Sequence, residues 1–204
     1  MQQINKFAFF IVGKENVSDF NGGSAAMELT IELNAKLQPM HRVQMFEEPL
    51  EKVLLQANAG ELLGGGTFQS ATGEIEKCDI TLDVKDDWIE KILAYLQRIR
   101  MIPKGSKIIC NEEITPVGQA EGLAIYLNGT DLQAEVYQSN DINELISELQ
   151  DVLGEKCFMF SWWEGRTETA LYFYGENYSE LYESVKAILD VHPLCKLSHT
   201  EQIA

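Results

Sequence analysis

Two stretches of this sequence share one order of features, and this repetition constrains the fold more than any other feature. Residues 73–107 and residues 165–199 each begin at a glycine, continue as an alternating strand pattern and enter an amphipathic helix pattern. Each then leaves the helix at a proline, Pro103 or Pro193, toward a short final strand. Gly73 and Gly165 lie 92 positions apart in a chain of 204 residues. This spacing indicates two small units of similar topology.

The strand and helix patterns predict an α+β fold. Residues 27–33 alternate apolar and polar side chains, as a strand with one face on a core does. A change of apolar phase in the strand at residues 74–84 predicts a β-bulge near residues 77–78. Further strands are predicted at residues 7–12, 61–69, 106–110, 122–127, 133–137, 157–163, 167–174 and 196–203, and helices at residues 47–57, 86–100, 142–153 and 177–190. We expect two tandem ferredoxin-like (split βαβ) units, each an antiparallel sheet with helices on one face.

The domain boundaries follow from a polar segment in the middle of the chain. Residues 111–118, with the sequence NEEITPVG, contain a proline and a glycine and are predicted to be a linker. The first ferredoxin-like unit then covers residues 1–110 and has an additional N-terminal strand at residues 7–12. The second unit covers residues 119–204.

The charge is strongly negative and unevenly distributed. The formal net charge is −16, of which residues 1–110 carry −3 and residues 111–204 carry −13. Such a surface repels phosphate groups, so we expect neither nucleic acid nor an anionic membrane surface as a partner. It attracts a basic protein partner over a long range. The alternative is that the acidic residues only keep the protein soluble.

The cysteines and histidines do not form a recognisable catalytic or metal-binding motif. The four cysteines are far apart, with no CxxC pair, and indicate reduced thiols in a cytoplasmic protein, although a disulfide remains open if the compartment is oxidising. His41, His192 and His199 do not belong to any known metal or nucleophile motif. We expect no catalytic residue, metal or cofactor, while a site assembled only in the folded chain remains open.

A run of glycines is the sharpest local motif. Gly64, Gly65 and Gly66 precede Thr67, and consecutive glycines let backbone amides approach an anion. The sequence lacks the lysine and the following helix of a phosphate-binding loop. A glycine run in a strand is more typical of a bulge or of close backbone packing. The run is therefore a candidate ligand loop with a structural alternative.

A hairpin tip in the acidic half is the candidate partner-binding site. Trp162 and Trp163 are adjacent on a predicted strand and must point to opposite faces, and Glu164 and Arg166 follow them. Tryptophan, tyrosine and arginine dominate the energetics of protein interfaces. The alternative is that both indoles pack against the first half or against a second copy of the chain.

The stretch GGGTFQSATGEIEKCDITLDV, followed by a helix pattern and PKGSK, resembles small uncharacterised bacterial proteins with a GGGT…GEI…CDI…PKGS pattern. This resemblance covers residues 60–108 and implies no activity. In its acidity the chain also resembles immunity proteins that neutralise bacterial toxins, without matched residues.

These observations predict a non-enzymatic, acidic protein-binding module, an inhibitor or immunity-like protein acting on a basic partner. The first alternative is a small-molecule-sensing domain, because paired ferredoxin-like units resemble ACT-type regulatory domains, which bind amino acids between subunits. An unidentified enzyme is the third hypothesis. A homo-oligomer remains open.

Overall fold

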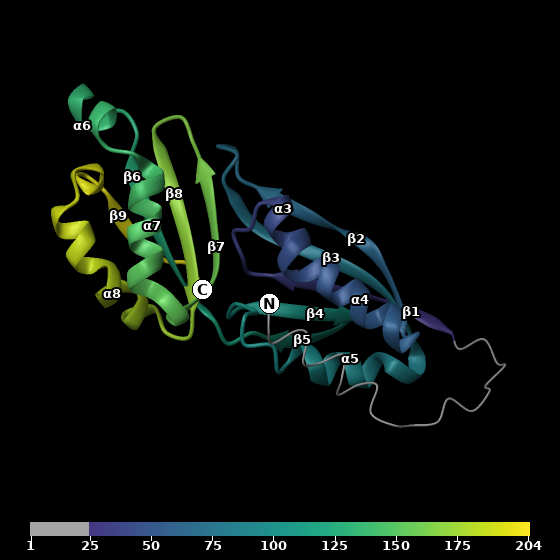
Figure 1. The fold of residues 1–204 in the computed structure, drawn as a ribbon. Helices are drawn as coiled ribbons and strands as arrows, with labels where there is room; N and C mark the ends of the chain where they lie inside the picture. The colour runs from purple at the N-terminus through teal and green to yellow at the C-terminus, as the bar shows by residue number, and fades with distance from the viewer. Residues whose placement is uncertain (1–24) are drawn as a thin grey trace.

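The computed structural model describes residues 25–204, and the strand predicted at residues 7–12 lies outside this part of the chain. The first unit contains β1 (Ala26–Leu33), α3 (Pro39–Arg42), a π-helical turn η1 (Val43–Glu47), α4 (Glu48–Ala57), β2 (Gly60–Gln69), β3 (Ile75–Lys85), η2 (Asp86–Trp88), α5 (Ile89–Leu96), β4 (Ser106–Cys110) and β5 (Glu113–Val117). The second unit contains β6 (Glu121–Asn128), α6 (Ala134–Ser139), α7 (Ile142–Leu153), η3 (Gly154–Lys156), β7 (Cys157–Glu164), β8 (Glu168–Gly175), α8 (Tyr178–Val191), η4 (Pro193–Cys195) and β9 (His199–Gln202). Figure 1 shows both units.

Each unit has the ferredoxin-like order of strands and helices, so the predicted fold class is confirmed. The first sheet has the strand order β2-β3-β1-β4-β5, with every neighbouring pair antiparallel. The second sheet has the order β7-β8-β6-β9, which is the same arrangement without a fifth strand. The segments β3–α5–β4 and β8–α8–β9 occupy equivalent places in the two units. These are the two stretches whose features repeat in the sequence.

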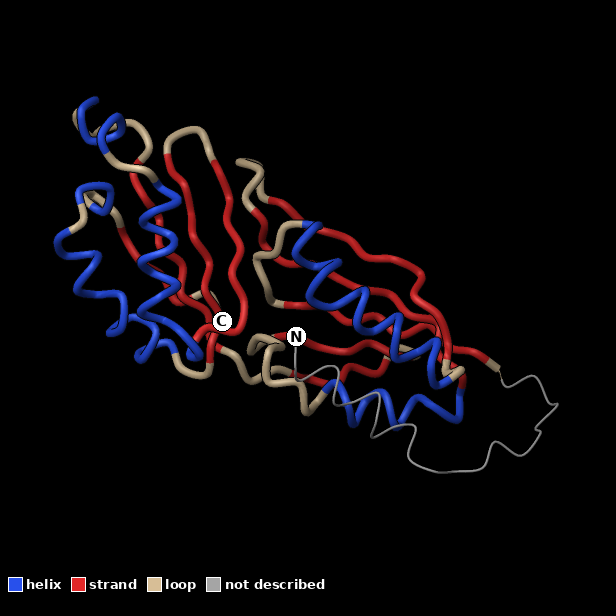
Figure 2. Tube along the Cα trace, in the orientation of Figure 1, coloured by secondary structure: helices blue, strands red, loops and turns tan. Residues whose placement is uncertain are grey.

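The first core lies between the first sheet and its helices, which Figure 2 shows as blue coils beside the red strands. Leu29, Ile31 and Leu33 of β1 are buried on one face, and their partners on β3 are buried beside them. Glu28, at least partly exposed like the other polar residues of β1, points to the opposite face. The alternation read from residues 27–33 therefore sets the orientation of the whole sheet.

The second sheet is covered on both faces. Leu123, Ile125 and Phe173 face α7 and α8 and form the second core with them. Tyr126 and Tyr172, on the other face, belong to the core of the first unit. The sheet of the second unit thus lies between its own helices and one end of the first unit (Figure 1).

Two segments have a different secondary structure from the one that the sequence predicts, and two predicted elements are shorter: the helix predicted at residues 86–100 ends at Leu96, and the strand predicted at residues 196–203 is His199–Gln202. The strand predicted at residues 133–137 is wrong, because residues 134–137 lie in α6, a short helix whose apolar Val136 and Tyr137 are adjacent and half-buried. Residues 111–118, expected to be a linker, form a tight turn and β5, and Val117 of β5 is buried. The alternating residues Thr115 and Val117 suit a strand, and Pro116 is tolerated because β5 is an edge strand. The chain passes between the sheets at residues 118–120.

Several local predictions are confirmed. α7 has the predicted bounds, and the side chain of Asp141 accepts a hydrogen bond from the backbone N–H of Asn143 at its start. The bulge in β3 lies one position from the predicted place, where the register with β2 skips Glu76. Among residues 25–204, no helix is long and apolar enough to cross a membrane.

Candidate functional site

The hairpin between β7 and β8 carries the predicted partner-binding residues. Trp162 and Trp163 point to opposite faces of the sheet, as expected, and both are half-buried. The Trp162 indole lies in the second core, with its ring centre 4.8 Å from that of His41. The Trp163 indole packs on the first core and covers Gly165, where a β-carbon would lie 2.2 Å from the ring. Both indoles are engaged within the chain, and Glu164 is exposed at the tip.

Polar contacts from Gln38 and from α3, which follows it, fix the outer edge of this hairpin. The backbone N–H of Gln38 donates to Ser161 Oγ at 3.2 Å, and Gln38 Nε2 donates to the carbonyl of Trp162 at 2.8 Å. The Nδ1 atom of His41 lies 2.9 Å from the same buried Ser161 hydroxyl. Burial lowers the pKa of His41. Of the predicted residues, Arg166 stands with Glu164 on the exposed tip.

The glycine run is filled by side chains of its own unit. The guanidinium of Arg42 donates to the carbonyl of Gly65 at 3.2 Å and to Thr67 Oγ1 at 2.6 Å. The amide of Gly66 donates to the carboxylate of Asp79 at 2.6 Å. A β-carbon at position 65 would lie 2.6 Å from the carbonyl oxygen of Asp79. These glycines make room for an arginine, and the amide of Gly66 already binds a carboxylate.

Gly64 is needed for its backbone conformation and not for close packing. It lies at the register shift between β2 and β3 and has a φ of 141°, which favours glycine. A β-carbon there would meet no atom within 4 Å. The structure therefore places all four predicted ligand-loop residues in one edge strand, beside the buried ion pair between Arg42 and Glu47.

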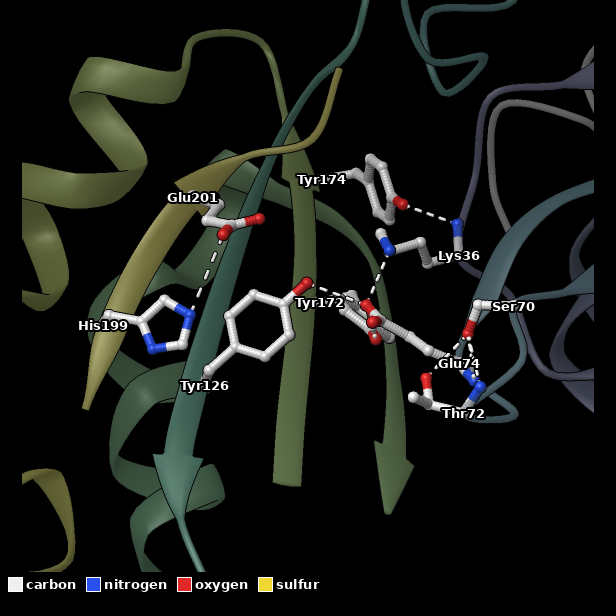
Figure 3. A network of polar contacts seen from close by, with 9 residues as sticks. All are labelled: Lys36, Ser70, Thr72, Glu74, Tyr126, Tyr172, Tyr174, His199 and Glu201. Carbon is white, nitrogen blue, oxygen red and sulfur yellow. Dashed lines mark hydrogen bonds and ion pairs between the residues drawn. The ribbon is translucent and has the colours of Figure 1, made fainter. Parts of the chain in front are cut away.

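A polar network joins the two units around Glu74 (Figure 3). Glu74 follows the turn between β2 and β3, and its carboxylate reaches the second sheet. The hydroxyls of Tyr126 and Tyr172 donate to Glu74 Oε1 at 2.8 and 2.9 Å, and Lys36 Nζ donates to it at 2.6 Å. The backbone N–H of Lys36 also donates to the hydroxyl of Tyr174 at 2.7 Å. We call these five residues the seam network.

The electrostatics of the seam network favour one protonation state. Burial opposes ionisation of Glu74, but the hydrogen bonds from Lys36, Tyr126 and Tyr172 outweigh it and lower the pKa of this carboxyl. Burial, followed by the hydrogen bond to Glu74, raises the pKa of both tyrosines. A charged acceptor thus binds two neutral hydroxyls and one ammonium, which suits a structural contact.

The histidines and thiols do not assemble into a metal site in residues 25–204, where no group of three His, Cys, Asp or Glu side chains could hold a metal ion. His199 stacks on Tyr126 at 4.6 Å, and its nitrogens lie 3.8 Å from Glu168 and Glu201. Burial raises the pKa of the Cys78 thiol to about 12 and that of Cys195 to about 11. These two thiols are therefore protonated at neutral pH and poor nucleophiles.

The outer surface of α7 and α8 carries several exposed acidic residues of the second unit. One row on α7, opposite its buried leucines, consists of Glu144, Glu148 and Asp151, and Glu155 of η3 follows it beyond the end of the helix. All four are exposed, and none makes an ion pair within the described residues. Glu180 and Glu183 of α8 are likewise exposed and unpaired among residues 25–204. We call these six residues the acidic helix surface. Sequence reasoning missed it, although the spacings of four and three residues between Glu144, Glu148 and Asp151 along α7 indicate it.

Comparisons with known proteins do not assign this surface. No family model matches the sequence, and no curated protein is similar to it. A solved structure assigned to a glycine cleavage system transcriptional repressor is 10% identical and aligns over 88% of this chain and 97% of its own, with a TM-score of 0.28. A protein from Bacteroides thetaiotaomicron is 12% identical over 89% of this chain and 96% of its own, with the same TM-score. These scores are too low to support an argument about function.

Proposed function

We propose that this protein is a non-enzymatic binding module whose acidic helix surface docks a basic protein, in the manner of an inhibitor or immunity protein. The observation that carries the proposal is the set of four exposed carboxylates along α7 and η3, none of which makes an ion pair within the described residues. Like charges at successive turns of a helix repel one another and destabilise it slightly. A basic partner relieves this repulsion.

The same surface also offers apolar contact area. Val152, beside the acidic row, is 45% exposed. Tyr178 and Tyr182 of α8 are half-buried and stack with ring centres 6.2 Å apart. Protein interfaces combine aromatic anchors with a polar rim, and charge complementarity raises the rate of association. The geometry therefore suits a protein partner better than a small cation.

The tip of the hairpin between β7 and β8 contributes less to the proposed binding surface than the acidic helix surface does. Trp162 and Trp163 are held by contacts within the chain, so the partner-binding role predicted for them passes to Glu164 and Arg166, which are exposed. Substitution of either indole by alanine is expected to lower stability before it affects binding.

Capture from a native lysate with charge-reversal variants tests the proposal. The helix variant is Glu144→Lys/Glu148→Lys/Asp151→Lys. The control has an identical charge change at exposed acids of the first unit and is Glu51→Lys/Glu61→Lys/Glu76→Lys. We expect a basic protein that binds the wild type and the control, is lost with the helix variant, and binds more weakly as salt rises. Equal capture by all three proteins, or equal loss with both variants, contradicts the proposal.

A second candidate function is small-molecule regulation of the ACT type. It is favoured by a cavity of about 670 Å³ at the end of β6, which Asn128, Tyr137, Asn140 and Thr169 help to line. This volume is within the range of ligand pockets, about 300–1,000 Å³. A thermal-shift screen of amino acids and other metabolites tests it, with Thr169→Leu to fill the cavity. A ligand that stabilises the wild type and the filled variant equally contradicts binding there.

A further inference from the structure

The cavity at the end of β6 has the charge of a site for a cation. It lies where β6, α6, the start of α7 and η4 meet, and it has a volume of about 670 Å³. Asp141 and Glu144 line it, and none of the described residues that line it is a lysine, an arginine or a histidine. Glu144 also belongs to the acidic helix surface. The cavity is therefore next to the surface that we propose for a basic partner.

The amide group of Asn140 is oriented so that its oxygen remains available. Asn140 Nδ2 donates a hydrogen bond to the backbone carbonyl of Val136 at 2.8 Å. A carbonyl oxygen only accepts hydrogen bonds, so this contact fixes which end of the amide is the nitrogen. Asn140 Oδ1 accepts no hydrogen bond within residues 25–204. Asn140 therefore offers the cavity an acceptor.

The two carboxylates of the cavity also have free acceptor atoms. Asp141 Oδ1 accepts hydrogen bonds from the backbone N–H and the side-chain amide of Asn143 at 2.8 and 2.9 Å, while Oδ2 accepts none within the described chain. The carboxylate of Glu144 makes neither a hydrogen bond nor an ion pair among residues 25–204. A ligand rich in donors and free of acceptors suits these three side chains, as an ammonium or a guanidinium group is.

The start of α7 does not reverse this preference. The N-terminus of a helix is equivalent to about half a positive charge, which the two carboxylates outweigh. The backbone N–H groups that could bind an anion are already used, because those of Asn143 and Glu144 donate to the side chain and the carbonyl of Asp141 at 2.8 and 3.1 Å. An anionic ligand is therefore disfavoured.

We propose that this cavity binds an alkylammonium or guanidinium group, supplied by a side chain of a basic protein partner or by a free amine. Leu127, Ile142 and Leu194, which also line the cavity, suit the alkyl chain that carries such a group. The inference rests on the proposed function in one respect, namely that a basic protein docks beside the cavity or a small molecule enters it. It adds the chemical class of the group that is bound.

A heteronuclear NMR titration of the full chain at pH 7 and low salt tests this proposal. The first probe is N-acetyl-lysine methylamide, which mimics a lysine of a protein partner, and the second is cadaverine, a free amine. The matched control probe is the same lysine amide acetylated at Nε, which has no charge. The backbone amides of Asn140, Glu144 and Thr169 report binding in the cavity. We expect a cationic probe to shift these amides, with a Kd at least about tenfold lower than that of the acetylated probe.

Charge-neutralising variants locate the bound cation. Glu144→Gln is expected to raise the Kd of the cationic probe about three- to fivefold, because it removes one partly exposed carboxylate. The control is Glu148→Gln, the same change one turn further along α7 and outside the cavity, for which less than about a twofold change is expected. Equal weakening by the two variants overturns the proposal. Equal affinity for the charged and acetylated probes, or no shift of the cavity amides, also overturns it.

The results also separate this proposal from the proposed function. A basic protein that is captured through α7, together with probes that do not bind the cavity, overturns the cavity proposal alone. Binding of the cationic probes without any captured protein supports the cavity proposal and indicates a free amine, and cadaverine is then expected to bind more tightly than the lysine amide. Binding of the lysine amide together with a captured basic protein supports a side chain of that partner as the source.

Discussion

Replacing Glu74 by glutamine is expected to weaken the contact between the units without changing its shape. Glu74→Gln keeps the size of the side chain and removes its charge. The carboxylate accepts three hydrogen bonds, from Lys36, Tyr126 and Tyr172. After the substitution, the Lys36 ammonium keeps its position in the seam network but loses its counterion.

The magnitude follows from the number of bonds and their exposure. A hydrogen bond to a charged group contributes about 1.5–3 kcal/mol, against about 1 kcal/mol for a neutral one. Three such bonds therefore lose on the order of 3 kcal/mol. The Lys36 side chain is 18% exposed and that of Glu74 is 19% exposed, so solvent screening reduces the expected loss to about 2 kcal/mol.

The assay is urea unfolding at pH 7, followed by tryptophan fluorescence, because Trp163 packs on the first core near the seam. The matched control is Glu76→Gln, an exposed residue two positions away, for which a change below about 0.5 kcal/mol is expected. The free energies of unfolding of the wild type and both variants are then compared.

The pH dependence separates charge from shape. The pKa of Glu74 in the folded protein is lower than its ordinary value of 4.5, so its contribution is fully present above that pH and is lost as the pH falls through the folded pKa. The difference between the wild type and Glu74→Gln is therefore expected to shrink below pH 4.5. A difference within 0.5 kcal/mol of zero at pH 7, or one that is the same in acid, refutes the reasoning.

Three further predictions concern single sites. Gly65→Ala places a methyl group 2.6 Å from the backbone carbonyl of Asp79 and is expected to cost about 1–3 kcal/mol, so an unchanged Tm contradicts the packing of the glycine run. Gly165→Ala displaces the Trp163 indole and shifts the fluorescence maximum to the red, and an unaltered spectrum argues against this contact. Cys78 has a pKa of about 12 and no exposed surface, so it is expected to resist iodoacetamide at pH 8 until the protein unfolds, which mass spectrometry of the alkylated peptides measures.

Local periodicity was enough to predict most of the fold. The alternation in residues 27–33 reports a face buried along the whole strand, and the α7 helix has a capping aspartate at its start. α6 was missed because residues 133–136 alternate polar and apolar side chains, and the helix is too short to show a helical period. β5 was missed because Pro116 and the turn before it resemble a linker, and only the sheet order shows that the proline is on a free edge.

The seam network could not be read from the sequence, because its members come from distant parts of the chain. Glu74 and Tyr172 are 98 positions apart, and neither belongs to a motif. The glycine run was recognised as unusual, but the arginine that fills it lies 23 positions away from Gly65. The acidic row on α7 is different, since its helical spacing is plain in the sequence once the helix is assigned.

The second sheet, packed on both faces, means that the second unit has a complete topology but cannot be separated cleanly from the first. If residues 119–204 were produced alone, the face with Tyr126, Tyr172 and Tyr174 would meet water and attract other chains. A substitution on this face must fit both the second sheet, to which it belongs, and the core of the first unit, on which it packs. Substitutions on one side of this contact therefore require matching substitutions on the other side. A cut or a graft at residue 118 removes the second unit together with the side chains that it contributes to the first core.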